Sequence, residues 1–232
     1  MTIDWLHFFL ALLLLWFPRQ VLRRGGEVLR LRRRHRPSPM VDINPAKMRE
    51  PGDPRVLFMV EIVKPRNYID FFRATVGSVM LLGGFAGFEA AVRAADDAPG
   101  TTVQLVLYGR LLILAIAVMI QSFRFERKPT MFPPIFFLSG VALGLCGPFA
   151  AGFSLVLVWT INLTLPNPTA FLSVFALLVG GFGLLFLGTG NEQPFFAVAL
   201  IFLPVLVSLL ARRRLVLFTK KVKRTSSSAL AS

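Results

Sequence analysis

The sequence has very little of the chemistry from which most active sites are built. Its 232 residues include one cysteine, Cys146, and two histidines, His7 and His35. A single cysteine excludes an intrachain disulfide, and a thiol within an apolar run is normally a small buried hydrophobic group. The two histidines lie in unlike surroundings, one apolar and one rich in arginine. We therefore expect no metal site, no cofactor and no catalytic residues.

Acidic residues are also scarce. The chain has 26 Lys and Arg residues against 12 Asp and Glu residues, which gives a net charge of +14. Charged residues make up 16% of the sequence, against about 25% in a typical soluble protein. A large positive charge can indicate nucleic-acid binding, but here the basic residues flank apolar blocks and form no single basic face. We expect no nucleic-acid partner.

Long apolar runs take the place of the missing polar residues. Hydrophobic residues make up 55% of the chain, and the mean hydropathy is +0.65. A helix needs about 20 apolar residues to cross a hydrocarbon core about 30 Å thick. Apolar blocks of that order cover residues 71–95, 103–123, 132–165, 169–188 and 195–211. The sequence therefore predicts an all-α, polytopic integral membrane helix bundle.

The order of polar and apolar segments divides the chain into four parts. These are an N-terminal anchor helix (1–18), a basic, proline-rich cytoplasmic segment (19–70), the membrane helix bundle (71–211) and a basic cytoplasmic tail (212–232). The first apolar block, residues 5–17, is not typical of a signal peptide, because Asp4 precedes it and Pro18 and Arg19 follow it. At this length it either spans the membrane or lies in the interface.

Two local patterns within these parts lead to further predictions. Residues 56–63 are predicted to form a short strand or an extended strip along the membrane surface. Further along, Asn167 or Thr169 is a candidate cap for a helix that begins near Pro168.

The block at residues 132–165 is too long for one crossing, because a single helix of this length would extend about 51 Å. Gly147 and Pro148 lie at its middle, and proline disrupts a helix interior. If the block is a hairpin, all Lys and Arg residues except Arg93 and Arg110 lie on one side of the membrane. The positive-inside rule then favours the hairpin over one kinked helix.

With the N-terminal anchor counted, we predict six crossings, with five as the alternative. The location would be the cell inner membrane, with the basic segment and the C-terminus in the cytoplasm.

Glu89, Arg110 and Arg93 are charged residues that lie well inside the apolar blocks. Such residues are costly in a membrane and usually have a partner. Glu89 lies ten residues before Pro99 and Arg110 lies eleven after it, which gives them the same depth in a helical hairpin. The sequence predicts an intramembrane ion pair between Glu89 and Arg110, with Arg93 as a second partner.

Glycine and arginine form two further patterns. Small residues allow close helix packing, and the candidate packing glycines are Gly83, Gly87, Gly140, Gly144 and Gly180. They indicate either packing within the chain or a subunit interface. The candidate contacts to anionic lipid headgroups are Arg30, Arg32, Arg33 and Arg34.

The sparse chemistry favours a non-enzymatic protein. We predict an accessory, assembly or interaction subunit of a larger membrane complex, whose partners are the lipid bilayer, anionic lipids and other membrane subunits. The alternative is a small solute, ion or lipid transporter or channel. A transporter would need a polar pathway at mid-membrane, whereas a subunit would need an apolar outer face for its partner.

Overall fold

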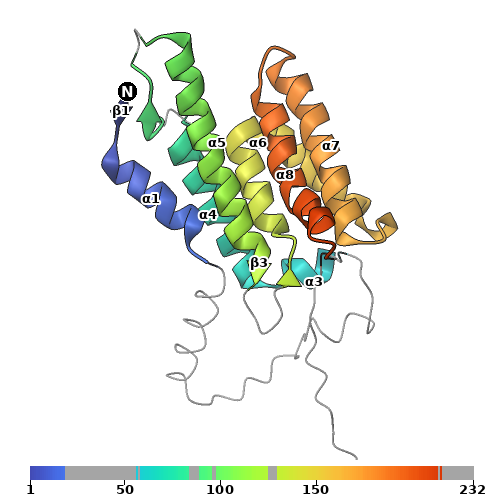
Figure 1. Cartoon of the computed structure of the whole chain (residues 1–232). Coiled ribbons are helices and arrows are strands. Elements are labelled where there is room, and N and C mark those ends of the chain that lie inside the picture. The colour runs from blue at the N-terminus through green and yellow to red at the C-terminus, as the bar shows by residue number, and fades with distance from the viewer. Residues whose placement is uncertain are drawn as a thin grey trace, which may run out of the picture.

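The computed structural model describes residues 1–18, 56, 58–83, 89–95, 98–124, 130–213 and 215. The helices are α1 (Trp5–Trp16), α3 (Phe58–Ile62), α4 (Pro65–Leu82), α5 (Gly100–Ser122), α6 (Ile135–Thr160), α7 (Pro168–Leu187) and α8 (Gln193–Leu210), with a 3-10 turn η1 (Asn162–Thr164). Two short antiparallel ladders pair β1 (Thr2–Ile3) with β2 (Val92–Arg93), and β3 (Phe123–Arg124) with β4 (Thr130–Met131). The predicted all-α bundle is confirmed (Figure 1).

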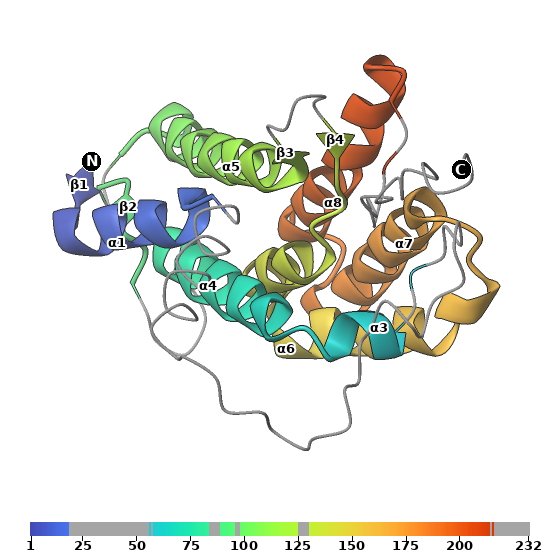
Figure 2. The ribbon, with the colours of Figure 1, turned by 90° about the horizontal axis from the view of Figure 1, so that it is seen from below.

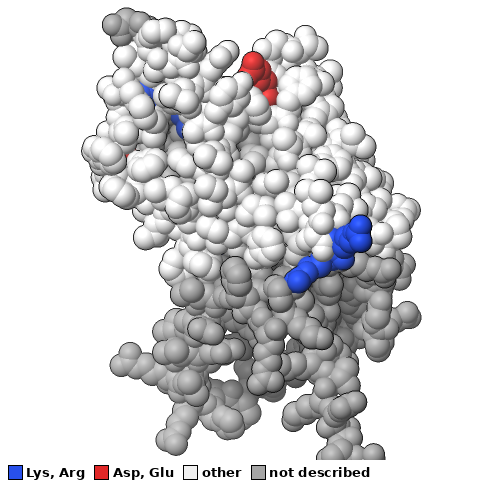
Figure 3. Space-filling model, viewed as in Figure 1, with Lys and Arg blue, Asp and Glu red and all other residues white. Residues whose placement is uncertain are grey.

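The outward surface of the bundle is apolar. Helices α5, α6, α7 and α8 each have the length and composition that a membrane crossing requires. Large apolar side chains stand exposed around the bundle, among them Leu105, Leu177 and Leu210. Figure 3 shows one mainly uncharged face, with an acidic patch near its upper edge and a basic patch lower down. Soluble proteins rarely expose an apolar surface this large, so the structure is that of a membrane protein.

Helix α6 is a hairpin and not one rod. Gly147 has φ 75° and ψ 174°, a conformation that breaks the helix and that glycine tolerates best. The rings of Phe136 and Trp159, near the two ends of α6, have centroids 5.8 Å apart. A straight helix would separate these residues by about 35 Å. The predicted hairpin is confirmed, although its arms are only 12 to 13 residues, or about 18–20 Å, long.

The predicted count of six crossings is not confirmed by the structure. Six rods run alternately up and down among the described residues: α4, α5, the two arms of α6, α7 and α8. Residues 5–17 were included in the predicted six, so α1 would be a seventh. With 12 residues, α1 extends about 18 Å, well short of a full hydrocarbon core.

Several boundaries also differ from the prediction. Helix α4 begins at Pro65 and ends at Leu82, whereas the sequence suggested an apolar block at 71–95. Residues 58–62 form the short helix α3, so the predicted strand or extended strip is wrong. At Pro168 the predicted cap is confirmed, because the Asn167 side chain accepts a hydrogen bond from the Ala170 N–H at 2.8 Å.

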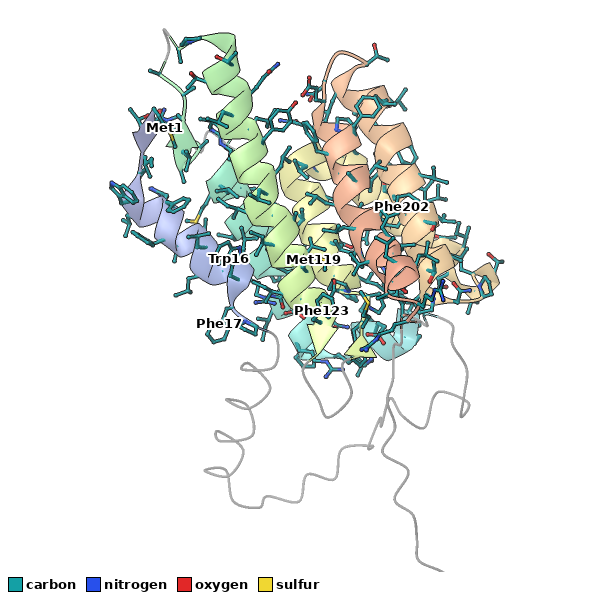
Figure 4. All side chains as sticks on the ribbon, in the orientation of Figure 1. Met1, Trp16, Phe17, Met119, Phe123 and Phe202 are labelled. Atoms are coloured by element: carbon teal, nitrogen blue, oxygen red, sulfur yellow. The ribbon has the colours of Figure 1, made fainter. Side chains whose placement is uncertain are left out.

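The bundle is layered around α6, with α4 on one side and α7 and α8 on the other. Figure 2 shows α1 and α7 at opposite sides of the molecule. Fully buried apolar side chains fill the centre, including Phe137, Phe171 and Phe175. Phe17 and Phe123 both lie at the lower end of the bundle in Figure 4, the end at which α1 and α5 finish. We refer to this as the lower end and to the opposite one as the upper end.

Candidate functional site

The densest group of buried polar side chains lies at the lower end of the bundle. Its members share burial and mutual hydrogen bonds, and we call them the basal network: Glu61, Lys64, Asn67, Asp70, Arg73 and Gln121. The first five are spaced three residues apart, from α3 through the first half of α4. Three-residue spacing places side chains on one helical face, so this stripe points into the bundle.

The first part of the basal network surrounds Glu61. Lys64 Nζ forms an ion pair with Glu61 Oε1. Asn67 Nδ2 donates to the Glu61 carbonyl oxygen at 2.7 Å and to Glu61 Oε2 at 3.0 Å. Lys64 is also the residue that precedes α4, whose first turn begins with Pro65. These bonds fix the corner between α3 and α4.

In the second part of the basal network, Arg73 connects four helices. Its Nε and Nη2 atoms each lie 3.0 Å from Asp70 Oδ1 on α4. Nη1 donates to the Phe17 carbonyl at the end of α1, and Nη2 donates to Gln121 Oε1 on α5 at 2.7 Å. The guanidinium also lies 5.4 Å from the centre of the Phe137 ring on α6. Such multiple anchoring fits the planar, multidentate guanidinium group and not a lysine.

Gln121 completes the contact with α1. Its Nε2 donates to the carbonyl oxygens of Leu15 at 3.1 Å and Phe17 at 3.0 Å. The last four carbonyl groups of a helix have no partner within it, and in a membrane an unpaired carbonyl is costly. Gln121 and Arg73 therefore act together as a cap for the lower end of α1.

The basal network is balanced in charge among its described members. Two carboxylates, Glu61 and Asp70, face two cations, Lys64 and Arg73. The hydrogen bonds given above run to backbone carbonyls and between the network's own side chains. Such an arrangement joins α1, α3, α4 and α5 and suits a structural clamp. Within the described part of the chain, no three His, Cys, Asp or Glu side chains are grouped so that they could hold a metal ion.

The predicted pair of Glu89 and Arg110 takes a different form. Glu89 pairs with Arg93 at 2.8 Å, and both side chains are largely exposed. The segment holding Glu89 is not helical, and it leads into β2. The prediction assumed a helix up to residue 95, and the early end of α4 removes the geometry on which the Glu89–Arg110 pair depended.

Arg110 instead binds backbone. Its Nη1 donates to the Leu82 carbonyl at 3.3 Å, and its Nη2 donates to the Val92 carbonyl. Leu82 is the last residue of α4, where the carbonyl groups form the negative end of the helix dipole. Arg110 thus caps the upper end of α4, as Arg73 and Gln121 cap the lower end of α1.

Three of the described packing glycines, Gly140, Gly144 and Gly180, lie against a neighbouring helix. An added Cβ at Gly140 would lie 2.8 Å from the Ala74 Cβ on α4, and one at Gly144 would overlap the Ser78 hydroxyl. At Gly180 the nearest atom would be Val198 Cγ2 on α8 at 2.8 Å. Gly83 ends α4 with φ 73°. Of the two readings of these glycines, the structure supports packing within the chain.

Some predicted positions lie outside the described residues. They are Gly87 and the candidate lipid-binding residues Arg30, Arg32, Arg33 and Arg34.

The basal network was missed because the sequence analysis assigned residues 19–70 to a cytoplasmic segment. The available signal was the row of five polar residues at three-residue spacing from 61 to 73. Gln121 carried a weaker signal, as a single amide near the end of an apolar helix.

The chain matches no protein family, no curated protein and no solved structure at a significant level.

Proposed function

We propose that this protein is a non-enzymatic, multi-pass membrane protein that acts as an accessory, assembly or interaction subunit of a membrane complex. The observation that carries the proposal is the exposed face of α5. Of the most apolar 18 consecutive residues of α5, only 22% are buried, against 50% for α6. An apolar helix that packs so little against its own chain is suited to pack against another protein.

The exposed residues of α5 form a stripe. Leu105, Leu112 and Ile116 follow at intervals of seven and four residues, which places them on one side of a helix. Tyr108 and Gly109 lie on the same side. The space around Gly109 is open, so another helix could approach the backbone closely there.

The basal network supports the same proposal. Its carboxylates are paired with Lys64 and Arg73, and Arg73 and Gln121 donate to carbonyls at the end of α1, which suits a rigid scaffold. Between the basal network and Arg110, α5 contributes three fully buried side chains to the apolar core, those of Leu114, Ala117 and Val118.

For the orientation, we propose that the lower end faces the cytoplasm at the cell inner membrane. The described segments break off at this end next to the basic stretches 19–55, 125–129 and 216–232. The six proposed crossings are then α4, α5, the two arms of α6, α7 and α8, with α1 packed alongside. In this arrangement Arg30, Arg32, Arg33 and Arg34 would meet anionic lipid headgroups.

Site-specific photo-crosslinking tests the proposed subunit role. A photoreactive amino acid at Leu112 is compared with one at Leu177, an equally exposed position on α7. In native membranes we expect a discrete protein adduct at Leu112 that mass spectrometry can identify, and only lipid adducts at Leu177. Lipid adducts alone at both positions would contradict the proposal.

One observation favours the alternative, a small solute, ion or lipid transporter. The backbone is not helical at Gly147, between the two short arms of α6, and broken helices are typical of transporter binding sites. Solute flux into liposomes containing the purified protein, reduced by Gly147→Ala, would favour the transporter.

A further inference from the structure

The two sides of the bundle have apolar surfaces of unequal height. On one side α7 has 20 residues and extends about 30 Å. Exposed apolar residues lie along its second half, with Leu177 at 67%, Leu185 at 72% and Leu187 at 37% exposure. On the opposite side the outermost helix is α1, which is about 18 Å long and runs obliquely, so its height is no more than this (Figures 1 and 2).

Hydrogen bonds fix the height at which α1 begins. The Asp4 N–H donates to the Ala91 carbonyl at 2.8 Å, and Arg110 donates to the next carbonyl, that of Val92. Arg110 is the eleventh of the 23 residues of α5. The start of α1 and the β1–β2 ladder are therefore level with the middle of α5, and Met1 lies below the upper end of α5 in Figure 4.

The lower end of α1 is fixed by Gln121, whose amide donates to the Leu15 and Phe17 carbonyls. Helix α1 thus covers α5 from about Arg110 to Gln121. Eleven residues of helix correspond to about 17 Å. The apolar surface formed by α1, with Leu6, Phe9 and Leu13 exposed, has this height and no more.

Charged groups lie directly above that surface. Glu89 and Arg93 form an ion pair with 73% and 47% of their side chains exposed. Asp4 and His7, 2.6 Å apart, are also exposed, and the contact with His7 lowers the pKa of the Asp4 carboxyl. A flat hydrocarbon core that reached the upper end of α7 would surround these charges and the edges of the β1–β2 ladder. Charged side chains and unpaired strand edges are both unfavourable in hydrocarbon.

We propose that phospholipid headgroups and their water descend along α1 to the level of the β1–β2 ladder, so that the bilayer is locally thinned on this side of the protein. The headgroups are zwitterionic, which matches a rim that carries charges of both signs. Thinning is the response of a bilayer to a short apolar surface, and its cost per ångström is modest compared with the burial of several charges. The leaflet affected is the one opposite the basic segments.

Spin-label accessibility provides the test. In a Cys146→Ser background, Leu6→Cys and Leu177→Cys are each labelled and reconstituted into dioleoylphosphatidylcholine liposomes. The two positions lie on opposite sides of the bundle, within about 17 Å of the lower end of α1 and about 14 Å of the lower end of α7, measured along each helix. We expect a water-soluble nickel chelate to relax the label at Leu6 several-fold more than the label at Leu177, with oxygen showing the reverse.

Each other outcome would overturn the proposal in a distinguishable way. Equal protection of both labels from the nickel chelate would show a flat bilayer. Protection of the Leu6 label from both reagents would show that protein, and not headgroups, covers α1. Access of the chelate to Leu177 as well would show that α7 does not face hydrocarbon, which also contradicts the membrane orientation proposed above.

A second variant tests the cause of the thinning. Glu89→Leu combined with Arg93→Leu removes the Glu89–Arg93 ion pair from the rim and leaves Asp4, His7 and α1 unaltered. We expect the nickel effect at Leu6 to fall several-fold, because hydrocarbon can then rise along this side. An unchanged nickel effect at Leu6 would show that the Glu89–Arg93 ion pair is not the cause of the thinning.

Discussion

Arg73 and Arg110 each donate to carbonyl groups at the end of a helix. Arg73 reaches the Phe17 carbonyl below α1, and Arg110 reaches the Leu82 carbonyl above α4. In water, solvent would satisfy such carbonyl groups, but inside a membrane the protein must do so. A guanidinium is well suited, because it offers several donors and a positive charge at the negative end of the helix dipole.

Arg73→Ala is expected to destabilise the protein by about 3 kcal/mol or more, the cost of removing one partner from a buried ion pair. Asp70 would lose its cation, and α1 would lose part of its cap. Thermal unfolding in mild detergent measures the effect. Arg93→Ala is the matched control, since its ion pair is exposed and worth at most about 1 kcal/mol. Equal losses for both variants would contradict the role given to Arg73.

A double-mutant cycle between Glu89 and Arg110 is expected to show a coupling energy near zero. Arg110→Ala should cost about 2 kcal/mol, because it removes charged donors from two carbonyls. Glu89→Ala should cost less than about 1 kcal/mol, because the pair with Arg93 is exposed. A coupling above about 1 kcal/mol would restore the ion pair suggested by the sequence.

At the scale of single residues, the sequence showed which polar residues are unusual, but it did not show which groups they bind. Arg110 stood out as a charge in an apolar helix, but its partners are backbone carbonyls, and every residue supplies one. Arg73 did not stand out, because it lies where the basic segment and the apolar block at residues 71–95 meet.

At the scale of helices, the contact between α4 and the first arm of α6 depends on small residues. Gly140 and Gly144 lie against Ala74 and Ser78, and the Ser78 hydroxyl lies 3.5 Å from the Gly140 carbonyl oxygen. Without a hydrophobic force between helices in lipid, such close approach supplies much of the attraction.

Gly144→Ala is therefore expected to destabilise the bundle by about 1–3 kcal/mol, the usual cost of overpacking. The added methyl group would overlap Ser78. Gly152→Ala, in the second arm of the same hairpin, is the control. Nothing lies within 4 Å of its added methyl group, so it should be neutral or stabilising by up to about 1 kcal/mol. Thermal unfolding of both variants measures the difference. If Gly144→Ala does not lower the stability, the close contact between Gly144 and Ser78 is excluded.

The hairpin was predictable from the sequence because length, a Gly-Pro pair and the distribution of charge all favoured it. The early end of α4 was not predictable in the same way. Residues 83–95 are as apolar as the helix before them, and hydropathy does not distinguish a helix from the extended segment that pairs with β1.

At the scale of the whole molecule, sidedness is the main consequence of the fold. If the lower end is cytoplasmic, the turn between α7 and α8 and the C-terminal tail lie on opposite sides of the membrane. In a Cys146→Ser background, an impermeant maleimide should label Asn191→Cys in intact cells and Ser227→Cys only after lysis. Labelling of Ser227→Cys in intact cells would contradict the orientation and the positive-inside argument behind it.

The membrane class and the basic end were readable from the sequence, because hydropathy and charge are sums over many residues. The count of crossings was not, because it depends on whether α1, a helix of only 12 residues, reaches both surfaces. Its height is set by single hydrogen bonds from Gln121 and to Ala91, which no composition argument contains.

The hairpin of α6 also bears on how the chain enters the membrane during synthesis. Each arm has about 12 or 13 residues, too few to be recognised alone as a span. The arms must therefore enter together, with their backbone polar groups already paired in helices. Since α4 is made first, the groove at Ala74 and Ser78 can receive Gly140 and Gly144 as they emerge.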